Sequence, residues 1–270
     1  MVFNIRDIDE TQTPLLEHLI ELRRRLVRAF LALAVAFGVC LYFSSQIFAL
    51  LVRPLAAAFP PGQGKLIYTK LYEAFFVDIK VALFAAFFVS FPIIANQLWA
   101  FVAPGLYAKE KKAFLPFLLA TPVLFAMGAS LAYFVVMPTA FKYFLTFQHT
   151  TAGLQQEALP AMGDYLDLVM RFIFMFGAAF LMPVLLLLLQ RAGIVTRQQL
   201  VGARRYVIVA NFVIAAVITP PDLVSMLMLA IPLVLLFEMT LLIMRIGEKR
   251  AARAAAKVET GEAAADESAT

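Results

Sequence analysis

The sequence predicts an all-α integral membrane protein with six transmembrane helices, both termini in the cytoplasm, an amphipathic N-terminal helix, and short fifth and sixth spans. Of its 270 residues, 63% are hydrophobic and only 15% are charged, whereas a soluble domain carries about 25% charged residues. The charges lie in short clusters between long apolar runs. A water-soluble globule is therefore excluded, and the clusters are interpreted as topology signals.

Six segments have the composition of membrane spans, which need about 20 mostly apolar residues. They lie near residues 26–48, 76–99, 114–138, 165–190, 205–219 and 223–244. The fifth has about 14 apolar residues before Pro220 and Pro221 and covers only about 21 Å at 1.5 Å per residue. Pro232 interrupts the sixth. We expect spans this short to thin the bilayer locally.

The basic residues predict the orientation, because loops rich in Lys and Arg stay in the cytoplasm. With six spans the termini share a side, and that side carries 17 of the 23 basic residues. We therefore expect a multi-pass protein of the cell inner membrane, with residues 1–247 as the membrane domain and both termini cytoplasmic. Residues 248–270 are rich in Ala, Glu and Lys with almost no large apolar side chains, which predicts a disordered cytoplasmic tail.

The composition argues against an enzyme, a metal site and a nucleic-acid partner. The chain has no Gly-Xaa-Ser-Xaa-Gly elbow, no His-Glu-Xaa-Xaa-His pair and no phosphate-binding Gly-rich loop. One cysteine, Cys40, and two histidines, His18 and His149, leave little to bind a metal, and no cofactor is expected. The basic residues form no continuous stripe that would suit nucleic acid.

Two segments on the predicted cytoplasmic side carry acidic residues of interest. Residues 14–26 form an amphipathic helix, in which Glu21 either pairs with Arg25 four residues on or faces a ligand. Residues 99–112 carry Glu110 among three lysines, with Trp99 nearby. Glu110 is either neutralised by those lysines or grips a guanidinium group with the help of an aromatic side chain.

Charged and polar groups inside spans are costly, so each is a candidate functional residue. Arg171 can pair with Asp167 on the same helix face, and we favour such a structural pair. Lys80 can extend its ammonium group towards the membrane surface. Glu238 and Asn211 are expected to find partners on other helices.

Four motifs together resemble the TatC family, the multi-spanning receptor subunit of the twin-arginine protein translocase. The resemblance covers about residues 14–245 in the right order. The motifs are LLEHLIELRRRL at 15–26, QLWAFVAPGLYAKEKK at 97–112, AYFVVMPTAF at 132–141 and ITPPDLVSMLMLAIP at 218–232.

The resemblance implies a receptor that binds twin-arginine signal peptides of folded precursor proteins, self-associates in a receptor complex, and works with TatA-type and TatB-type single-span partners under the proton-motive force. It also implies the residues that bind the signal peptide: Glu110, Glu21, Phe101, Leu106 and Arg23. Two adjacent arginines in an extended peptide point in different directions, so carboxylates from two segments suit them. A planar guanidinium engages a carboxylate through two hydrogen bonds, which favours Arg over Lys.

Two positions depart from the family pattern at the surface where a partner helix docks. Many relatives have a glutamate where this chain has Leu181, and a glutamine where it has Met226. Thr219 and Asn211 remain as polar candidates, so we expect chiefly apolar docking with Asn211 as a polar contact. Pro220, Pro221 and Asp222 are predicted to form a structural turn.

Two other functions stay open on the residues alone. A small multi-span secondary transporter or channel would need polar residues facing a midplane cavity, and the midplane holds mainly Asn211 and prolines. A membrane scaffold or insertion factor would lack specificity for arginine pairs. Binding of a twin-arginine peptide that depends on Glu110 would separate the receptor from both.

Overall fold

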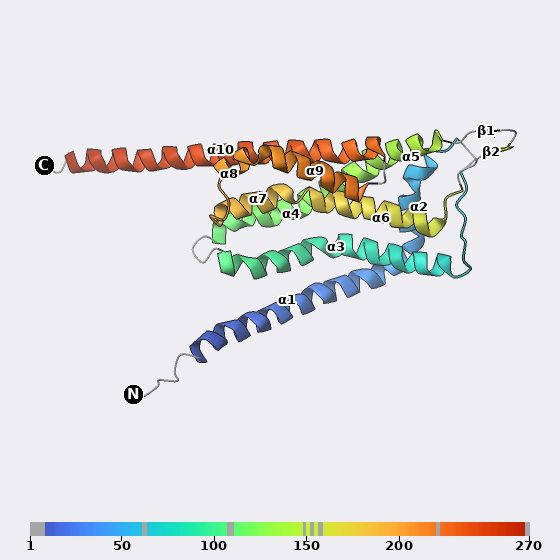
Figure 1. Cartoon of the computed structure of the whole chain (residues 1–270). Coiled ribbons are helices and arrows are strands. Elements are labelled where there is room, and N and C mark those ends of the chain that lie inside the picture. The colour runs from blue at the N-terminus through green and yellow to red at the C-terminus, as the bar shows by residue number, and fades with distance from the viewer. Residues whose placement is uncertain are drawn as a thin grey trace, which may run out of the picture. The chain divides into compact units, whose positions relative to one another are not determined.

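The computed structural model describes residues 9–60, 64–106, 111–147, 150–151, 154–155, 159–219 and 222–267. These residues divide into two compact units, residues 1–177 and 178–270. Almost all of the described residues are helical, as Figure 1 shows. The two-residue strands β1 (Thr150–Thr151) and β2 (Leu154–Gln155) pair antiparallel.

The first unit is a helical bundle that begins with α1 and ends within α6. Its elements are α1 (Asp9–Tyr42), α2 (Ser44–Ala56), α3 (Glu73–Leu106), α4 (Lys111–Leu131), the π-helix η2 (Ala132–Val136), α5 (Met137–Leu145) and α6 (Met162–Ala179). The π-helix ends two residues before Pro138, whose missing N–H interrupts the regular ladder of hydrogen bonds. The connections at 57–72 and 146–161 lie at one end of this unit, called here the loop end.

Small residues let α1 and α3 approach closely as antiparallel neighbours. Ala36 and Cys40 of α1 are buried with Ala82 and Ala86 of α3. Close backbone approach through small side chains is typical of helix contacts in membranes. A cluster of aromatic rings then joins α3, α4 and α6, with Phe91 and Phe125 stacked at 3.9 Å between ring centroids.

The second unit is built on one long helix. It contains α7 (Met182–Arg191), α8 (Arg197–Gly202), α9 (Arg204–Ile218) and α10 (Leu223–Glu267). Its core gathers Leu200 from α8 with Phe237, Leu241 and Met244 from α10. The break before α7 coincides with Pro183, which cannot donate a backbone hydrogen bond to the preceding turn.

Five helical segments among the described residues are long and apolar enough to cross a membrane. They are Leu19–Tyr42, Glu73–Phe101, Leu119–Leu145, Met162–Arg191 and Leu223–Lys249. The all-helical, multi-span prediction is therefore confirmed, while α9, at 15 residues, is shorter than a full span. The helix α10 runs to Glu267 and so enters residues 248–270, whose disorder stays a prediction. Repeated Ala, Glu and Lys, which gave the prediction of disorder, are also strong helix formers.

Candidate functional site

Glu21, on α1, is held by its own helix. Arg25 Nε donates a hydrogen bond to Glu21 Oε1 at 3.0 Å, and a second guanidinium nitrogen forms an ion pair with the same oxygen. The predicted pair at four-residue spacing is thus present. Arg23, two residues before Arg25, is exposed. A ligand guanidinium that reached Glu21 would have to share its carboxylate with Arg25.

Glu21 and Phe101 lie at the same height along two antiparallel helices. The buried contact between the two helices has its midpoint at residue 38 of α1, between Ala36 and Cys40, and at residue 84 of α3, between Ala82 and Ala86. Glu21 precedes the first of these positions by 17 residues and Phe101 follows the second by 17, which is about 25 Å along each helix. Phe101 is half-buried. Two of the predicted signal-peptide residues therefore share a level at the α3–α4 end of the unit.

The α3–α4 hairpin frames the segment that carries Glu110. Trp99 Nε1 donates a hydrogen bond to Thr121 Oγ1 at 2.8 Å, which ties the end of α3 to α4. Leu106 is the last residue of α3, and Lys111 is the first of α4. Glu110 itself lies outside the described residues, in the short connection between these two helices.

The candidates for partner docking lie in the second unit. Asn211 is buried in the middle of α9, with only 2% of its surface exposed, and its side-chain nitrogen Nδ2 has no hydrogen-bond acceptor among the described residues. Thr219, at the end of α9, is buried too, and its hydroxyl donates to the Ala215 carbonyl at 2.9 Å. Asn211 is therefore one of the buried polar groups, with Asp222 Oδ2 and Ser225 Oγ, that lack a hydrogen-bond partner among the described residues of this unit.

The turn between α9 and α10 is closed by a helix cap. Asp222 Oδ1 accepts a hydrogen bond from the backbone N–H of Ser225 at 2.6 Å, as expected of an N-cap residue. Met226 follows in the first turn of α10, and Leu181 lies in the break before α7. Both side chains are half-buried. Pro220 and Pro221 lie outside the described residues.

One of the predicted ion pairs is wrong and one predicted partner is found. Asp167 does not pair with Arg171 but with Lys80 of α3, whose Nζ donates to both carboxylate oxygens at 2.9 and 3.0 Å. Lys80 on a neighbouring helix is thus the partner of Asp167, in place of Arg171 one turn along the same helix. Glu238 of α10 pairs with Arg204 of α9 at 3.0 Å, which supplies the partner expected on another helix.

A carboxylate that the sequence did not single out anchors the loop end. Glu73, the first residue of α3, accepts hydrogen bonds from the backbone N–H groups of Thr69, Lys70 and Gly163 at 2.7, 3.2 and 2.7 Å. This one side chain joins the first long connection to the start of α6. Glu73 lies at the N-terminus of α3, where an acidic side chain stabilises a helix. This position is the feature of the sequence from which its role could have been predicted.

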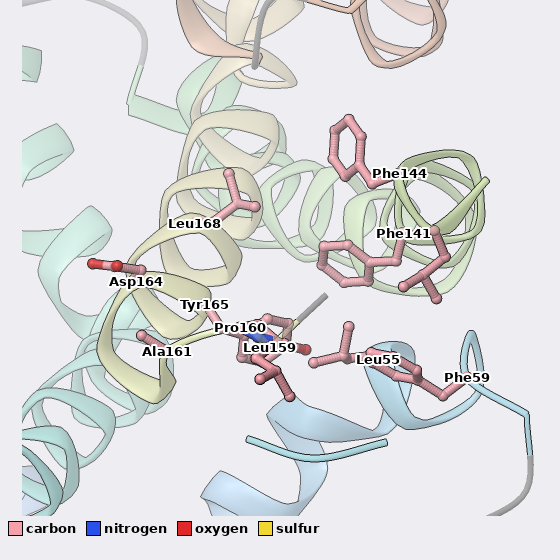
Figure 2. Close-up of a pocket in the computed structure, with 11 residues that line it drawn as sticks. Leu55, Phe59, Phe141, Phe144, Leu159, Pro160, Ala161, Asp164, Tyr165 and Leu168 are labelled. Carbon is pink, nitrogen blue, oxygen red and sulfur yellow. The ribbon is translucent and has the colours of Figure 1, made fainter. Parts of the chain in front are cut away.

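An apolar cavity of about 390 Å³ lies beside this anchor, between α2, α5 and the start of α6. Figure 2 shows Phe141 and Phe144 on one wall and Leu55 with Phe59 on another. The Asp164 carboxylate points away from these rings (Figure 2). The sequence reasoning missed the cavity because its lining comes from three separate elements.

Comparison with known proteins decides the family. The sequence profile described as Sec-independent protein translocase protein (TatC) matches residues 17–232. The chain belongs to the TatC family. It is 50% identical over 249 residues to the TatC protein of Magnetococcus marinus, covering 92% of this chain and 90% of that protein. It is 38% identical over 231 residues to TatC of Escherichia coli, covering 86% and 87% of the two chains.

The fold of the TatC family is also shared. A crystal structure of the twin-arginine translocase receptor TatC in DDM superposes with a TM-score of 0.72 at 37% identity, covering 84% of this chain and 99% of that one. A second crystal structure of the receptor gives 0.71 at 38% identity, covering 85% and 98%. The chain is accordingly a multi-pass component of a Sec-independent protein translocase, a transport protein and not an enzyme. The alternative of a small transporter or channel is not favoured.

Proposed function

We propose that this TatC chain is the receptor and core subunit that binds twin-arginine signal peptides at the cytoplasmic face of the inner membrane. It recruits TatA-type and TatB-type single-span partners for export of folded proteins, driven by the proton-motive force. The supporting observation is the shared level of Glu21 on α1 and Phe101 on α3, next to the connection that carries Glu110.

Two carboxylates on separate segments explain why a pair of arginines would be preferred. Glu110 is the principal carboxylate, and Glu21 is the second. Phe101 offers a ring against which a guanidinium can stack, while Leu106 and Arg23 border the site. Each charge-assisted hydrogen bond contributes about 1.5–3 kcal/mol, and less where lysines beside Glu110 or Arg25 beside Glu21 compete.

The proposed topology has six spans with both termini and the α3–α4 connection in the cytoplasm. Seventeen of 23 basic residues lie on that side, as expected of short loops that flank membrane spans. The loop end of the first unit then faces the outside. Copies of the chain associate in the receptor complex.

The partner helix docks on α9 and the start of α10. The surface there is mostly apolar, and Val209, Val213 and Val217 of α9 are 62%, 57% and 80% exposed. Thr219, Met226 and Leu181 border the docking surface. Asn211 is the proposed polar contact: it is buried beneath the exposed valine face, and its Nδ2 lacks an acceptor among the described residues, so a helix that reached it could supply one.

The variant Glu110→Gln tests the receptor. It keeps the size of the side chain and removes its charge, so crosslinking of a twin-arginine precursor should fall about tenfold or more, while the protein remains in the membrane. Glu248→Gln is the matched control, since Glu248 is a cytoplasmic-side carboxylate that pairs with Arg197. Normal crosslinking and export by Glu110→Gln would refute the assignment, as would equal binding of a twin-lysine peptide.

Asn211→Leu tests the docking surface. Loss of the amide should reduce co-purification of the single-span partner several-fold and leave binding of the signal peptide intact. Leu242→Ala, at an exposed apolar position of α10 away from the docking surface, is the control and should leave co-purification unchanged. Photo-crosslinkers placed along α9 that never capture a single-span helix would contradict the docking proposal.

A further inference from the structure

The exposed face of α6 presents charges in a fixed order from the loop end inwards. Asp164, Asp167 and Arg171 are all exposed, at offsets of zero, three and seven residues on one helix face. Lys80 of α3 neutralises Asp167, and both of these side chains are 49% exposed. The order is therefore the Asp164 carboxylate, the neutral Asp167–Lys80 ion pair and the Arg171 guanidinium. Phe174 comes next along the face and is 39% exposed.

The apolar span gives the depth of each charge. Met162–Arg191 has 30 residues, which is about 45 Å and matches a bilayer with its headgroups. The hydrocarbon layer of about 30 Å then begins about 7.5 Å, or five residues, after Met162. Asp167 lies at this boundary. With the segment centred in the bilayer in this way, Arg171 is four residues deeper, about 6 Å inside the hydrocarbon.

Arg171 lacks a counter-charge in the part of the chain that the structure describes. The nearest carboxylate on its face, Asp167, accepts both of its contacts from Lys80. An arginine inside a membrane helix is costly, and the cost falls when its charged group reaches the headgroup region. Because side chains on a helix tilt towards its N-terminus, Arg171 points back to the boundary near Asp167.

We propose that this face binds the headgroup of a phosphoethanolamine lipid from the leaflet at the loop end. The Arg171 guanidinium holds the phosphate, with the Lys80 ammonium next to it. The Asp164 carboxylate, nearer the water, accepts hydrogen bonds from the lipid ammonium group. Charge complementarity carries the assignment, because a phosphoethanolamine headgroup has its ammonium on the water side and its phosphate on the hydrocarbon side.

The acyl chains would lie against apolar side chains deeper on the same two helices. Leu83, one turn past Lys80 on α3, is 50% exposed, and Phe174 follows Arg171 on α6. Phe174 is fixed by a ring contact with Phe87 of α3, at 5.5 Å between centroids. The site is thus a surface shared by two helices that the Lys80–Asp167 ion pair and the Phe87–Phe174 ring contact join. It does not depend on the proposed receptor function, and the proposed topology decides only which leaflet supplies the lipid.

Native mass spectrometry of the full chain, delipidated in detergent and titrated with defined lipids, tests the proposal. The wild-type protein should retain a phosphatidylethanolamine molecule in preference to phosphatidylglycerol, which lacks the ammonium group. Arg171→Leu should weaken phosphatidylethanolamine binding about tenfold, and Arg171→Lys should weaken it less. Asp164→Asn should remove the preference over phosphatidylglycerol while lipid binding persists.

Lys142→Leu is the matched control, because Lys142 is an exposed cation at the end of α5, away from this face. Unchanged thermal unfolding of Arg171→Leu would show that the fold survives. Equal retention of both lipids by the wild type, or unaltered binding by Arg171→Leu, would overturn the proposal. So would loss of a co-purifying single-span protein from Arg171→Leu with lipid binding unchanged, since the counter-charge would then be an acidic partner helix.

Discussion

A proline and two tyrosines make a compensating group at the junction of α2 with the rest of the first unit. Pro54 lies inside α2 and has no backbone N–H, so the Leu50 carbonyl loses its usual partner four residues on. Tyr133 of η2 donates its hydroxyl to that carbonyl at 2.7 Å. Tyr165 of α6 donates to the next carbonyl, that of Leu51, at 2.8 Å. Side chains from two other elements thus satisfy backbone groups of α2.

Tyr133→Phe should therefore destabilise the fold by about 0.5–1.5 kcal/mol, the net contribution of one hydrogen bond. Leu50 and Tyr133 both line an apolar cavity of about 480 Å³. In a Pro54→Ala background the restored N–H can bond to Leu50, so the same substitution should cost about 1 kcal/mol less. Unfolding in mixed detergent measures all four proteins. Equal costs in the two backgrounds would contradict the compensation.

At the level of elements, α6 packs against α4 through a position where only glycine fits. A methyl group at Gly177 would come within 2.7 Å of the Phe125 ring. Phe125 is held in place by its stack on Phe91 of α3 and by contact with Phe174 of α6. Three helices are therefore fixed by a close approach that leaves no room for a larger residue.

Gly177→Ala should lower stability by about 1–3 kcal/mol, because overpacking moves the stacked rings. Gly38→Ala is the control, since a methyl group at Gly38 of α1 meets nothing within 4 Å. That change should be neutral or stabilise the helix by about 0.5–1 kcal/mol. Thermal unfolding of the purified proteins distinguishes the two positions. If Gly177→Ala lowered stability less than Gly38→Ala, the aromatic rings around Gly177 would have moved to accommodate the methyl group, and the prediction would be wrong.

The elements themselves could be predicted from the sequence because membrane spans leave a composition signal that needs no partner. Runs of apolar residues placed five long helices correctly, and Pro220 with Pro221 marked the end of α9. The Glu21–Arg25 pair was also predictable, since it depends only on helical spacing.

Contacts between distant elements could not be predicted in the same way. Asp167 met Lys80, 87 residues away, instead of Arg171 one turn along its own helix. Glu73 was overlooked because its partners, the N–H groups of Thr69 and Gly163, carry no side-chain signal. For Glu110 the sequence gives only the carboxylate and its neighbours, and the prediction of its role depends on the family.

At the scale of the whole molecule, the short α9 raises the question of whether it makes the fifth of the six proposed crossings. Fifteen residues span about 22 Å, less than the hydrocarbon layer of about 30 Å. Two ion pairs with α10 suggest an answer. Arg204 pairs with Glu238 and Arg197 with Glu248, ten residues further along α10, or about 15 Å. The chain thus continues along α10 through α8, and α8 with α9 together match a full crossing.

Cysteine accessibility in a Cys40→Ala background tests this crossing, since Cys40 is the sole native cysteine. Single cysteines replace Lys65 in the first long connection, Thr196 before α8, and Leu223 at the start of α10, all of which are exposed. A membrane-impermeant maleimide added to intact cells should label the cysteines at 65 and 223, and should reach the one at 196 only after permeabilisation.

Each site controls for the others. If the cysteines at 196 and 223 react from the same side, α8 and α9 do not cross, and the chain has five spans with termini on opposite sides. Glu110 could then still face the cytoplasm, but the tail of α10 could not. Six spans place 17 of the 23 basic residues on one side of the membrane. Since such residues favour the cytoplasm, we expect the cysteines at 196 and 223 to react from opposite sides.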